Sequence, residues 1–239
     1  MNQLKITIIG NSVALRVRPT KSYPKNKNYT YQLNELLHAS LPYHSIIIDN
    51  KALGASTIYN ISLNIDKYIN TFPNFYVLNF GVVDASTREV PLWFYRLATS
   101  KRDNIIVSFC RFFYRGVIPK IRPFLVRLRA RKSWIPRKKF VRLFENLITT
   151  LTRETNAKII VIPINPANDR IENNLPGTRK NHLLYNHIMK SIVEKYPDHY
   201  YLDDLTLTPT EDYPDGVHFS LKGHEIIAKK IFNIITHCF

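Results

Sequence analysis

The stretch LKITIIGNS, residues 4–12, is the part of the sequence that decides the fold. Its first six residues are mainly apolar and rich in β-branched side chains, which is typical of a buried β-strand, and the run ends at Gly10. Ser12 follows Gly10 and Asn11 directly, at the expected start of a helix. Such a serine is exposed at the carboxyl edge of a sheet, where helix-start N–H groups stabilise negative charge. The stretch predicts either a nucleophile at Ser12 or only a helix cap at Asn11 or Ser12.

Four further runs of the same kind follow along the chain, at residues 43–49, 74–80, 157–164 and, more weakly, 199–204. Apolar residues at helical spacing lie between and after them, at residues 30–41, 56–69, 140–155, 181–196 and 221–235. This alternation predicts an α/β fold, a doubly wound three-layer sandwich with a five-stranded parallel sheet. The length of 239 residues fits a single domain, residues 1–239.

The net charge of +16 is concentrated in one segment. No acidic residue lies between Asp103 and Glu145, whereas residues 111–142 contain eight Arg and four Lys. The segment from about 105 to 140 is also aromatic and does not fit the alternation, so we expect a basic helical insertion that lies beside the sheet as a lid. Three prolines are expected to break it into short pieces: Pro119, Pro123 and Pro136.

A charge that is local indicates a local anionic partner. Three partners remain open for residues 111–142: an anionic glycan, nucleotide-sugar or CoA group, an anionic membrane surface, or a nucleic acid. Nucleic acid is disfavoured, because the segment contains no recognisable nucleic-acid-binding motif. An ordinary solvated helix face usually mixes both signs of charge, and this segment does not.

Other features exclude several classes of protein. The two cysteines, Cys110 and Cys238, have neither disulfide-framework nor metal-ligand spacing, and no metal site is expected. The N-terminal apolar run is too short for a signal peptide, and no window approaches the roughly 18 apolar residues of a membrane span. We therefore expect a cytoplasmic protein that is soluble or associated with a membrane surface.

A second stretch, DGVHFSLKGHEII at residues 215–227, contains Asp215 and His218 three residues apart, before a helical pattern. A serine nucleophile needs a base, and the base needs an acceptor that orients it. The alternative is local: a turn at Asp215 and Gly216, followed by a polar residue before a cap at Ser220.

Taken together, the stretches resemble the SGNH (GDSL-type) hydrolase superfamily, which has a Ser after its first strand and D-x-x-H before its last helix. Two middle blocks agree. Gly54 follows the second expected strand, and VLNFGVVD places Gly81 and Asp84 after the third. The four blocks occur in the family's order and cover nearly the whole core outside the insertion. The resemblance implies a flavodoxin-like SGNH fold.

The resemblance also implies roles for individual residues. Ser12 would be the nucleophile, His218 the general base and then acid, and Asp215 the group that orients the imidazole. The backbone N–H groups of Ser12 and Gly54 would form two parts of the oxyanion hole.

Two positions depart from the family's pattern. Asn11 replaces the usual Asp, to which it is nearly isosteric. Val83 replaces an Asn that normally donates its side-chain amide to the oxyanion, and loss of one such donor costs about 10²–10³ in rate. Either another donor substitutes, such as Asn11 or Asn79, or the enzyme is slow, or the protein is no enzyme. The segment GVVDASTR, residues 81–88, resembles a form of this block in SGNH-like proteins near bacterial surface-polysaccharide genes.

Arginines near these blocks suit a substrate that carries carboxylate or phosphate groups. Arg16 and Arg88, together with Asp84, are the candidate substrate-binding residues, whereas Arg18 is expected to be a solvated surface residue and His224 a structural one.

The most probable activity is therefore that of an SGNH-type serine esterase or O-acyltransferase. It would act on acetyl esters of a carbohydrate, such as a bacterial surface polysaccharide or its precursor. No cofactor is expected, apart from an acyl donor such as acetyl-CoA in the case of a transferase. The alternative is a catalytically weak SGNH-fold protein that binds glycan or lipid in polysaccharide assembly.

Overall fold

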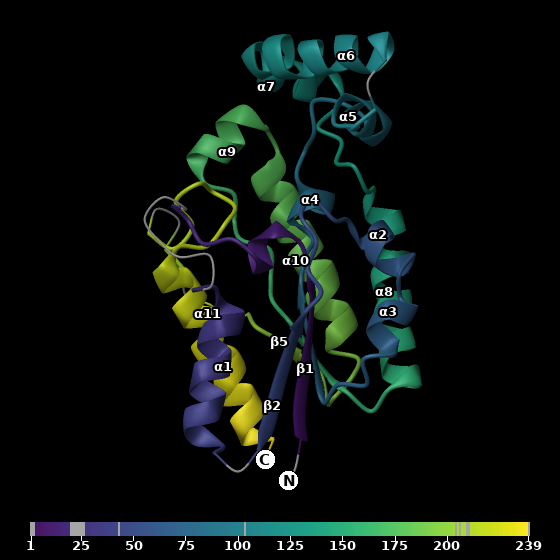
Figure 1. Ribbon diagram of the computed structural model, residues 1–239. Helices are drawn as coiled ribbons and strands as arrows, with labels where there is room; N and C mark the ends of the chain where they lie inside the picture. Colours follow the sequence, from purple (N-terminus) through teal and green to yellow (C-terminus); the bar gives the residue numbers. More distant parts are fainter. Residues whose placement is uncertain are drawn as a thin grey trace.

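A five-stranded sheet forms the centre of the protein (Figure 1). The computed structural model describes residues 3–19, 27–42, 44–102, 104–203, 205, 207–208 and 211–238. The strands are β1 (Gln3–Gly10), β2 (Ser45–Asn50), β3 (Phe75–Asn79), β4 (Lys158–Val161) and β5 (Tyr200–Tyr201). Their order is β2-β1-β3-β4-β5, and all pairs are parallel. This is the flavodoxin-like doubly wound order, so the predicted fold class is confirmed.

Helices cover both faces of this sheet (Figure 1). One face carries α1 (Tyr29–Ser40) and α11 (Leu221–His237), which contact each other. The other face carries α2 (Ile58–Ser62), α3 (Asp66–Ile69), α8 (Arg137–Glu154) and α10 (Thr178–Val193). The central strand β3 is buried throughout, and β1 is buried over its last residues, because helices cover both of their faces. The expected three layers are present.

The two outer strands on one side are shorter than their sequence patterns predict. The run at residues 157–164 continues past the end of β4 at Val161, and Pro163 within it has no N–H for a sheet ladder. The run at residues 199–204 forms only the two-residue strand β5. Tyr43 and Asp204, at the ends of two expected strands, lie outside the described residues.

The helix expected at residues 56–69 is two helices. Thr57 caps α2, with a reciprocal pair of hydrogen bonds to Asn60. The helix ends at Ser62, whose hydroxyl donates to the Ile58 carbonyl at 2.9 Å, and the Asn64 amide donates to the Asn60 carbonyl at 2.9 Å. Such side-chain bonds compete with the helix ladder, which explains why the apolar spacing alone overestimated the length.

The basic insertion is a long helical rod at one end of the molecule (Figure 1). It consists of α6 (Ile105–Phe112), a π-helical turn η2 (Phe113–Val117) and α7 (Ile118–Leu128), with α5 (Leu92–Ala98) packed against α6. The expected break at Pro123 is wrong, because Pro123 lies inside α7. Pro119 lies in the first turn of α7, where a missing N–H costs little, and packing of the buried Ile118 and Val126 stabilises the helix around Pro123. Pro136 does precede a new helix, as the N-cap of α8.

Arg88 ties this rod to the core. Its guanidinium lies over the Trp134 ring, 4.2 Å from the centroid, and donates to the Val83 carbonyl at 3.2 Å. Arg129 donates to the Arg88 carbonyl at 2.6 Å. The neighbouring buried Glu89 pairs with Arg122 of α7 at 3.3 Å. The segment after the third strand therefore serves as the attachment point of the insertion.

No helix in the described part of the chain is long and apolar enough to cross a membrane.

The end of β1 allows no side chain at residue 10. A Cβ there would lie 2.7 Å from the Asn79 carbonyl oxygen and 3.2 Å from the Ala14 Cβ. We expect Gly10→Ala to lower the free energy of unfolding by about 1–3 kcal/mol, because the backbone must move. Gly116→Ala is the control, since nothing lies within 4 Å of a Cβ there. Urea denaturation of both variants tests this, and equal stabilities would contradict it.

Candidate active site

Ser12 lies immediately beyond the carboxyl end of β1, as the first residue of the short helix η1 (Ser12–Ala14). The Asn11 side chain accepts from the Val13 N–H at 3.1 Å and so caps this helix. The Asn11 N–H donates to the Asn79 carbonyl of β3 at 3.2 Å. Asn11 is therefore a cap, and this cap places Ser12 at the edge of the sheet, whereas the role of Ser12 as a nucleophile stays a prediction.

The side chains of Ser12, His218 and Asp215 form a continuous hydrogen-bonded chain. His218 Nε2 lies 2.9 Å from Ser12 Oγ, and His218 Nδ1 lies 2.8 Å from Asp215 Oδ2. A carboxylate only accepts, so Nδ1 carries the proton and Nε2 of the neutral ring is left to accept from the Ser12 hydroxyl. The fold thus brings Ser12 to a pair of residues that lies more than 200 positions later in the sequence.

Asp215 is held ionised by its surroundings. Its Oδ1 accepts from the N–H groups of Val217 at 3.0 Å and His218 at 2.7 Å. Burial by itself raises the pKa of Asp215, but hydrogen bonds from the His218 ring and these two N–H groups outweigh it and hold the pKa well below its usual range. A permanently ionised Asp215 fixes the tautomer and orientation of the imidazole.

Arg18 is a contributor to the site that the sequence did not reveal. We expected a solvated surface residue, but its Nε donates to Asp215 Oδ2 at 3.1 Å. Its backbone N–H donates to the Phe219 carbonyl at 2.9 Å, next to His218. Arg18 therefore joins the first and last blocks, although no local pattern marks it out.

The backbone donors predicted for an oxyanion hole are available. Among the described residues, the Ser12 and Gly54 N–H groups make no hydrogen bond. Gly54 is exposed, and its loop is fixed to the end of β1 because the Leu53 N–H donates to the Gly10 carbonyl at 3.0 Å. Val83 is buried, and its side chain has no hydrogen-bond donor.

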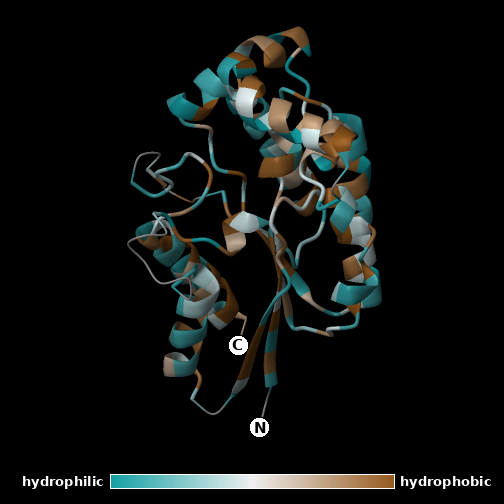
Figure 2. Ribbon diagram, turned by 45° about the horizontal axis from the view of Figure 1, so that its top comes forward, coloured by the Kyte–Doolittle hydropathy of each residue, from teal (hydrophilic) through white to brown (hydrophobic). Residues whose placement is uncertain are grey.

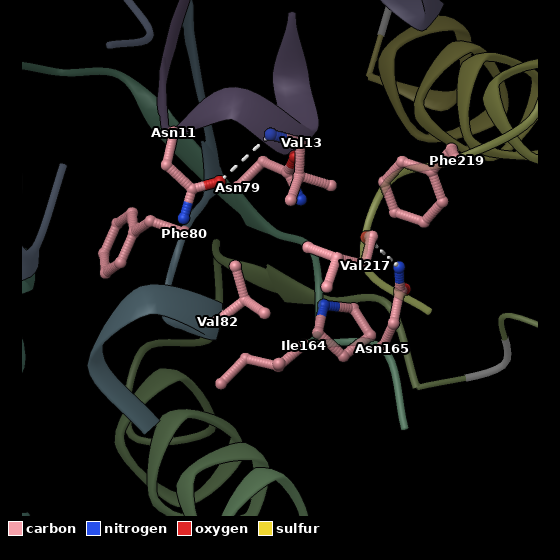
Figure 3. A pocket seen from close by; sticks show the side chains of 10 residues that line it. Asn11, Val13, Asn79, Phe80, Val82, Ile164, Asn165, Val217 and Phe219 are labelled. Carbon is pink, nitrogen blue, oxygen red and sulfur yellow. Dashed lines mark hydrogen bonds between the residues drawn. The ribbon is translucent and has the colours of Figure 1, made fainter. Parts of the chain in front are cut away.

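A small cavity of about 10 Å³ (Figure 3) is lined by residues that include the chain neighbours of Ser12 and of His218. It is mostly apolar, and Asn11 and Asn79 line it together with Val82, Ile164 and Val217. Among the described residues that line the cavity, Asn11 Nδ2 and Asn79 Oδ1 are buried polar atoms without a hydrogen-bond partner. Neither Gly54 nor Val83 borders this cavity. That Asn11 or Asn79 replaces the missing amide stays a prediction.

Asp84 is not placed to contact a substrate. Its side chain is fully buried, and Oδ1 accepts from the Ile58 N–H at 2.9 Å, at the start of α2. Burial raises the pKa of Asp84 to about 7, although the Ile58 N–H and the charge of Arg88 act in the opposite direction. The expected substrate contact is thus corrected to support of a helix start in the core.

The two candidate substrate arginines differ in their surroundings. The guanidinium of Arg88 is occupied by Trp134 and the Val83 carbonyl, as described above, and faces the insertion. Arg16 is exposed, four residues after Ser12, and its carbonyl accepts from His224 Nε2 at 3.1 Å. Only Arg16 of the pair is free to meet a ligand in solution, and its role stays a prediction.

His224 is structural, as expected. Its Nδ1 accepts from the Tyr29 N–H at 3.1 Å while Nε2 donates to Arg16, so the ring joins α1, α11 and the segment after Ser12. Burial lowers the pKa of His224 to about 4, which keeps the ring neutral. Among the described residues, no three His, Cys, Asp or Glu side chains gather as metal ligands.

A basic groove of about 830 Å³ lies between the return from the insertion and α10. Five cationic residues line it without an acidic one: Arg129, Arg131, Lys132, Arg137 and Lys180. The rings of Trp134 and Tyr185 form part of its wall. The C-terminal part of the basic segment therefore surrounds a concave surface suited to an anionic ligand.

Asp84 should give the protein a distinctive pH dependence. Between about pH 4 and pH 7 the folded protein keeps a proton on Asp84 that the unfolded chain has released, so this residue lowers stability as the pH rises. Asp84→Asn keeps an acceptor for Ile58 and cannot titrate. We expect the free energy of unfolding of the wild type, measured relative to that of Asp84→Asn, to fall by a few kcal/mol from pH 5 to pH 8, because buried groups such as His224 contribute equally to both proteins. The exposed Asp66→Asn should retain the loss, and equal slopes in all three proteins would contradict the assignment.

No family model matches the chain, and no curated protein matches it. Solved structures do. A catalytic mutant of the acetylxylan esterase Axe2 from Geobacillus stearothermophilus has a TM-score of 0.64 and 18% identity, over 98% of this chain and 95% of that one. Unmutated Axe2 gives a TM-score of 0.63 and 19% identity over 97% and 94%. An alpha/beta hydrolase, LAE5, from the metagenome of Lake Arreo, Spain, gives 0.61 and 15% over 97% and 94%. Nearly the whole chain thus shares the fold of these enzymes. Sequence identities this low are evidence for a common fold and for nothing more.

Proposed function

We propose that the protein is a serine-dependent esterase that removes acetyl groups from a carbohydrate. The observation that carries this proposal is the hydrogen-bonded chain Ser12–His218–Asp215, with a correctly oriented imidazole and an ionised carboxylate behind it. A serine, a base and an orienting acceptor in this geometry are the requirements for nucleophilic acyl chemistry.

The reaction would proceed through an acyl-enzyme. Ser12 Oγ attacks the ester carbonyl carbon as its proton passes to His218 Nε2, and the resulting oxyanion faces the N–H groups of Ser12 and Gly54. The ester C–O bond then breaks, and the leaving sugar oxygen takes the proton from His218. Water attacks acyl-Ser12, giving its proton to His218, and acetic acid leaves as the serine regains its proton.

Two observations support an anionic carbohydrate as the substrate. Structures that share the fold over nearly the whole chain belong to acetylxylan esterases, whose substrates are acetylated sugars. The basic groove provides five cations and two aromatic rings, a composition that suits a sugar chain bearing carboxylate or phosphate groups. A bacterial surface polysaccharide or its precursor has this chemistry.

Acyl transfer is the second candidate activity. The same acyl-enzyme is resolved by a sugar hydroxyl in place of water, with a donor such as acetyl-CoA, and Arg131, Lys132 and Arg137 of the groove suit the donor's phosphates. Incubation with acetyl-CoA and a deacetylated anionic glycan discriminates the two activities. Acetyl groups that appear on the glycan indicate transfer, whereas acetate released only from the acetylated glycan indicates hydrolysis.

A binding protein with feeble catalysis is the competing class, and the absence of a side-chain donor at Val83 is the observation that favours it. On this hypothesis the triad is a remnant and the glycan or a lipid is retained without turnover. Activity that depends on both Ser12 and His218 would exclude this hypothesis.

Replacing either end of the triad should remove the activity. We expect Ser12→Ala and His218→Ala each to lower kcat/KM for p-nitrophenyl acetate and for an acetylated glycan by about 10³-fold or more. A fluorophosphonate probe should add to Ser12 in the wild type, as seen by mass spectrometry of the intact protein, and not to Ser12→Ala. Ser108→Ala and His187→Ala, both at exposed positions, are the matched controls. A probe adduct that persists in Ser12→Ala would refute the nucleophile assignment.

The unpaired amide of Asn11 should compensate for Val83. Asn11→Asp keeps the acceptor for the Val13 N–H and removes the side-chain N–H donor. We therefore expect kcat to fall by a factor of about 10²–10³ while the structure of the protein is retained. Adding Val83→Asn to that variant should recover part of the loss by restoring a donor at the family's usual place. Asn79→Asp is the control and should leave kcat within a few-fold. Full activity in Asn11→Asp would exclude Asn11 as the donor.

A further inference from the structure

The helical rod carries a row of large apolar side chains on its solvent side. Ile105 is 86% exposed, Phe112 70% and Phe124 62%. We call the complete set the apolar stripe: Ile105, Ile106, Phe109, Phe112, Phe113, Ile121, Phe124 and Leu128. Scattered exposed apolar residues are ordinary in proteins, but a contiguous set of this kind marks an interaction surface.

The spacing of the stripe places its members on one side of the rod. In α6 they recur at i, i+4 and i+7, from Ile105 through Phe109 to Phe112, and in α7 at i, i+3 and i+7, from Ile121 through Phe124 to Leu128. The π turn between the helices takes an extra residue per turn, which rotates α7 back by roughly a quarter turn relative to an unbroken α-helix. That rotation aligns the two rows.

The opposite side of the rod is the side that faces the protein. Val107, Cys110, Ile118 and Val126 are buried there, and α6 packs against α5. The stripe is therefore not the core-facing side of an amphipathic helix. Figure 2 shows hydrophobic residues on the rod at the outer end of the molecule, away from the sheet.

Basic residues accompany the stripe. Arg115, Lys120 and Arg127 are exposed on the same rod, and among the described residues they form no ion pair. No acidic residue occurs in the sequence from residue 104 to residue 144. A helical surface with aromatic and branched aliphatic side chains beside unneutralised cations matches the interface of an anionic bilayer, where apolar groups enter the acyl boundary and cations meet the headgroups.

We propose that the apolar stripe and the cations Arg115, Lys120 and Arg127 bind the surface of a membrane that contains anionic lipids. The rod lies along the interface and does not cross it, because no helix of the described chain is long and apolar enough to span. This assignment moves the membrane contact to residues 105–128, away from the basic groove of residues 129–137, and does not depend on Ser12 being a nucleophile.

The rod stands at the end of the molecule toward which the strands run (Figure 1). Ser12 lies at that carboxyl edge, and α7 contacts α9 (Asp169–Asn174), whose Arg170 donates to the Asp215 carbonyl at 3.3 Å. Docking of the rod therefore orients the catalytic end of the sheet toward the bilayer, so a substrate carried on a lipid would approach from the bound side.

Co-sedimentation with large unilamellar vesicles tests the proposal on the full chain. We expect binding to vesicles of phosphatidylcholine with 30% phosphatidylglycerol, and at least about tenfold weaker binding to phosphatidylcholine alone. The combined variant Phe109→Ser, Phe112→Ser and Phe124→Ser should lose at least about tenfold in affinity. These side chains are exposed, so the variant should fold, which circular dichroism verifies.

Matched controls separate local from general effects. Leu63→Ser with Leu183→Ser removes exposed apolar residues outside the rod and should bind like the wild type. Lys120→Glu with Arg127→Glu should abolish binding, whereas Lys67→Glu with Lys138→Glu makes the same change in net charge outside the rod and the basic groove and should retain most of the binding.

Three results would overturn the proposal. One is equal binding by the wild type and the phenylalanine variant. Another is a wild-type dimer in light scattering that the phenylalanine variant disrupts, with no binding to vesicles, which would assign the stripe to a second copy of the chain. The third is duplex DNA binding at physiological salt that depends on Lys120 and Arg127 while the vesicles stay free of protein.

Discussion

One carboxylate connects the parts of this protein that chemistry requires to meet. Asp215 accepts from the His218 ring, from two backbone N–H groups of its own turn and from Arg18 after the first strand. The hydrogen bonds from the backbone N–H groups shape the turn, and the bond from the His218 ring sets its tautomer. Arg18 connects the segment after the first strand to the turn before the last helix. Four donors on one ion make the geometry specific, and all four hydrogen bonds weaken if the carboxylate is neutralised. The position of Ser12 relative to His218 follows from this arrangement.

The sequence was sufficient to predict the architecture, because most strands are continuous apolar runs and small residues follow some of them. Gly10 is an example: a Cβ at this position would collide with the Asn79 carbonyl oxygen, so only glycine fits. Ser12 was identified by its place directly after the first strand, and Asp215 and His218 by their spacing before the last helix. The sequence could not identify Arg18, since a pair 197 residues apart leaves no local trace. It also overestimated the helix after Thr57, where hydroxyl and amide side chains compete with the backbone.

The third block shows how a motif can be recognised and its roles still be misassigned. Asp84 and Arg88 occupy the expected places, yet one caps α2 from inside the core and the other holds Trp134 and the base of the insertion. Apolar residue types and their spacing predict burial, but nothing in this block marks the charged side chain of Asp84 as buried. In the SGNH family that the sequence resembles, this block donates a side-chain amide to the oxyanion. In this protein, residues 81–88 mainly connect the insertion to the core. This connection carries the rod, so the departure at Val83 and the presence of the insertion concern the same few residues.

The two tryptophans of the chain lie on the two sides of that connection. Trp93, on α5, is 66% exposed, whereas the indole of Trp134 lies beneath a guanidinium and donates to the Val90 carbonyl at 2.9 Å. Their fluorescence should therefore respond to different events. A change in the polarity around Trp93 shifts the emission of Trp93, whereas separation from Arg88 alters the emission of Trp134. Intrinsic fluorescence can thus distinguish a change in what surrounds the outer helices from a change in how they are seated, without a label attached to the protein.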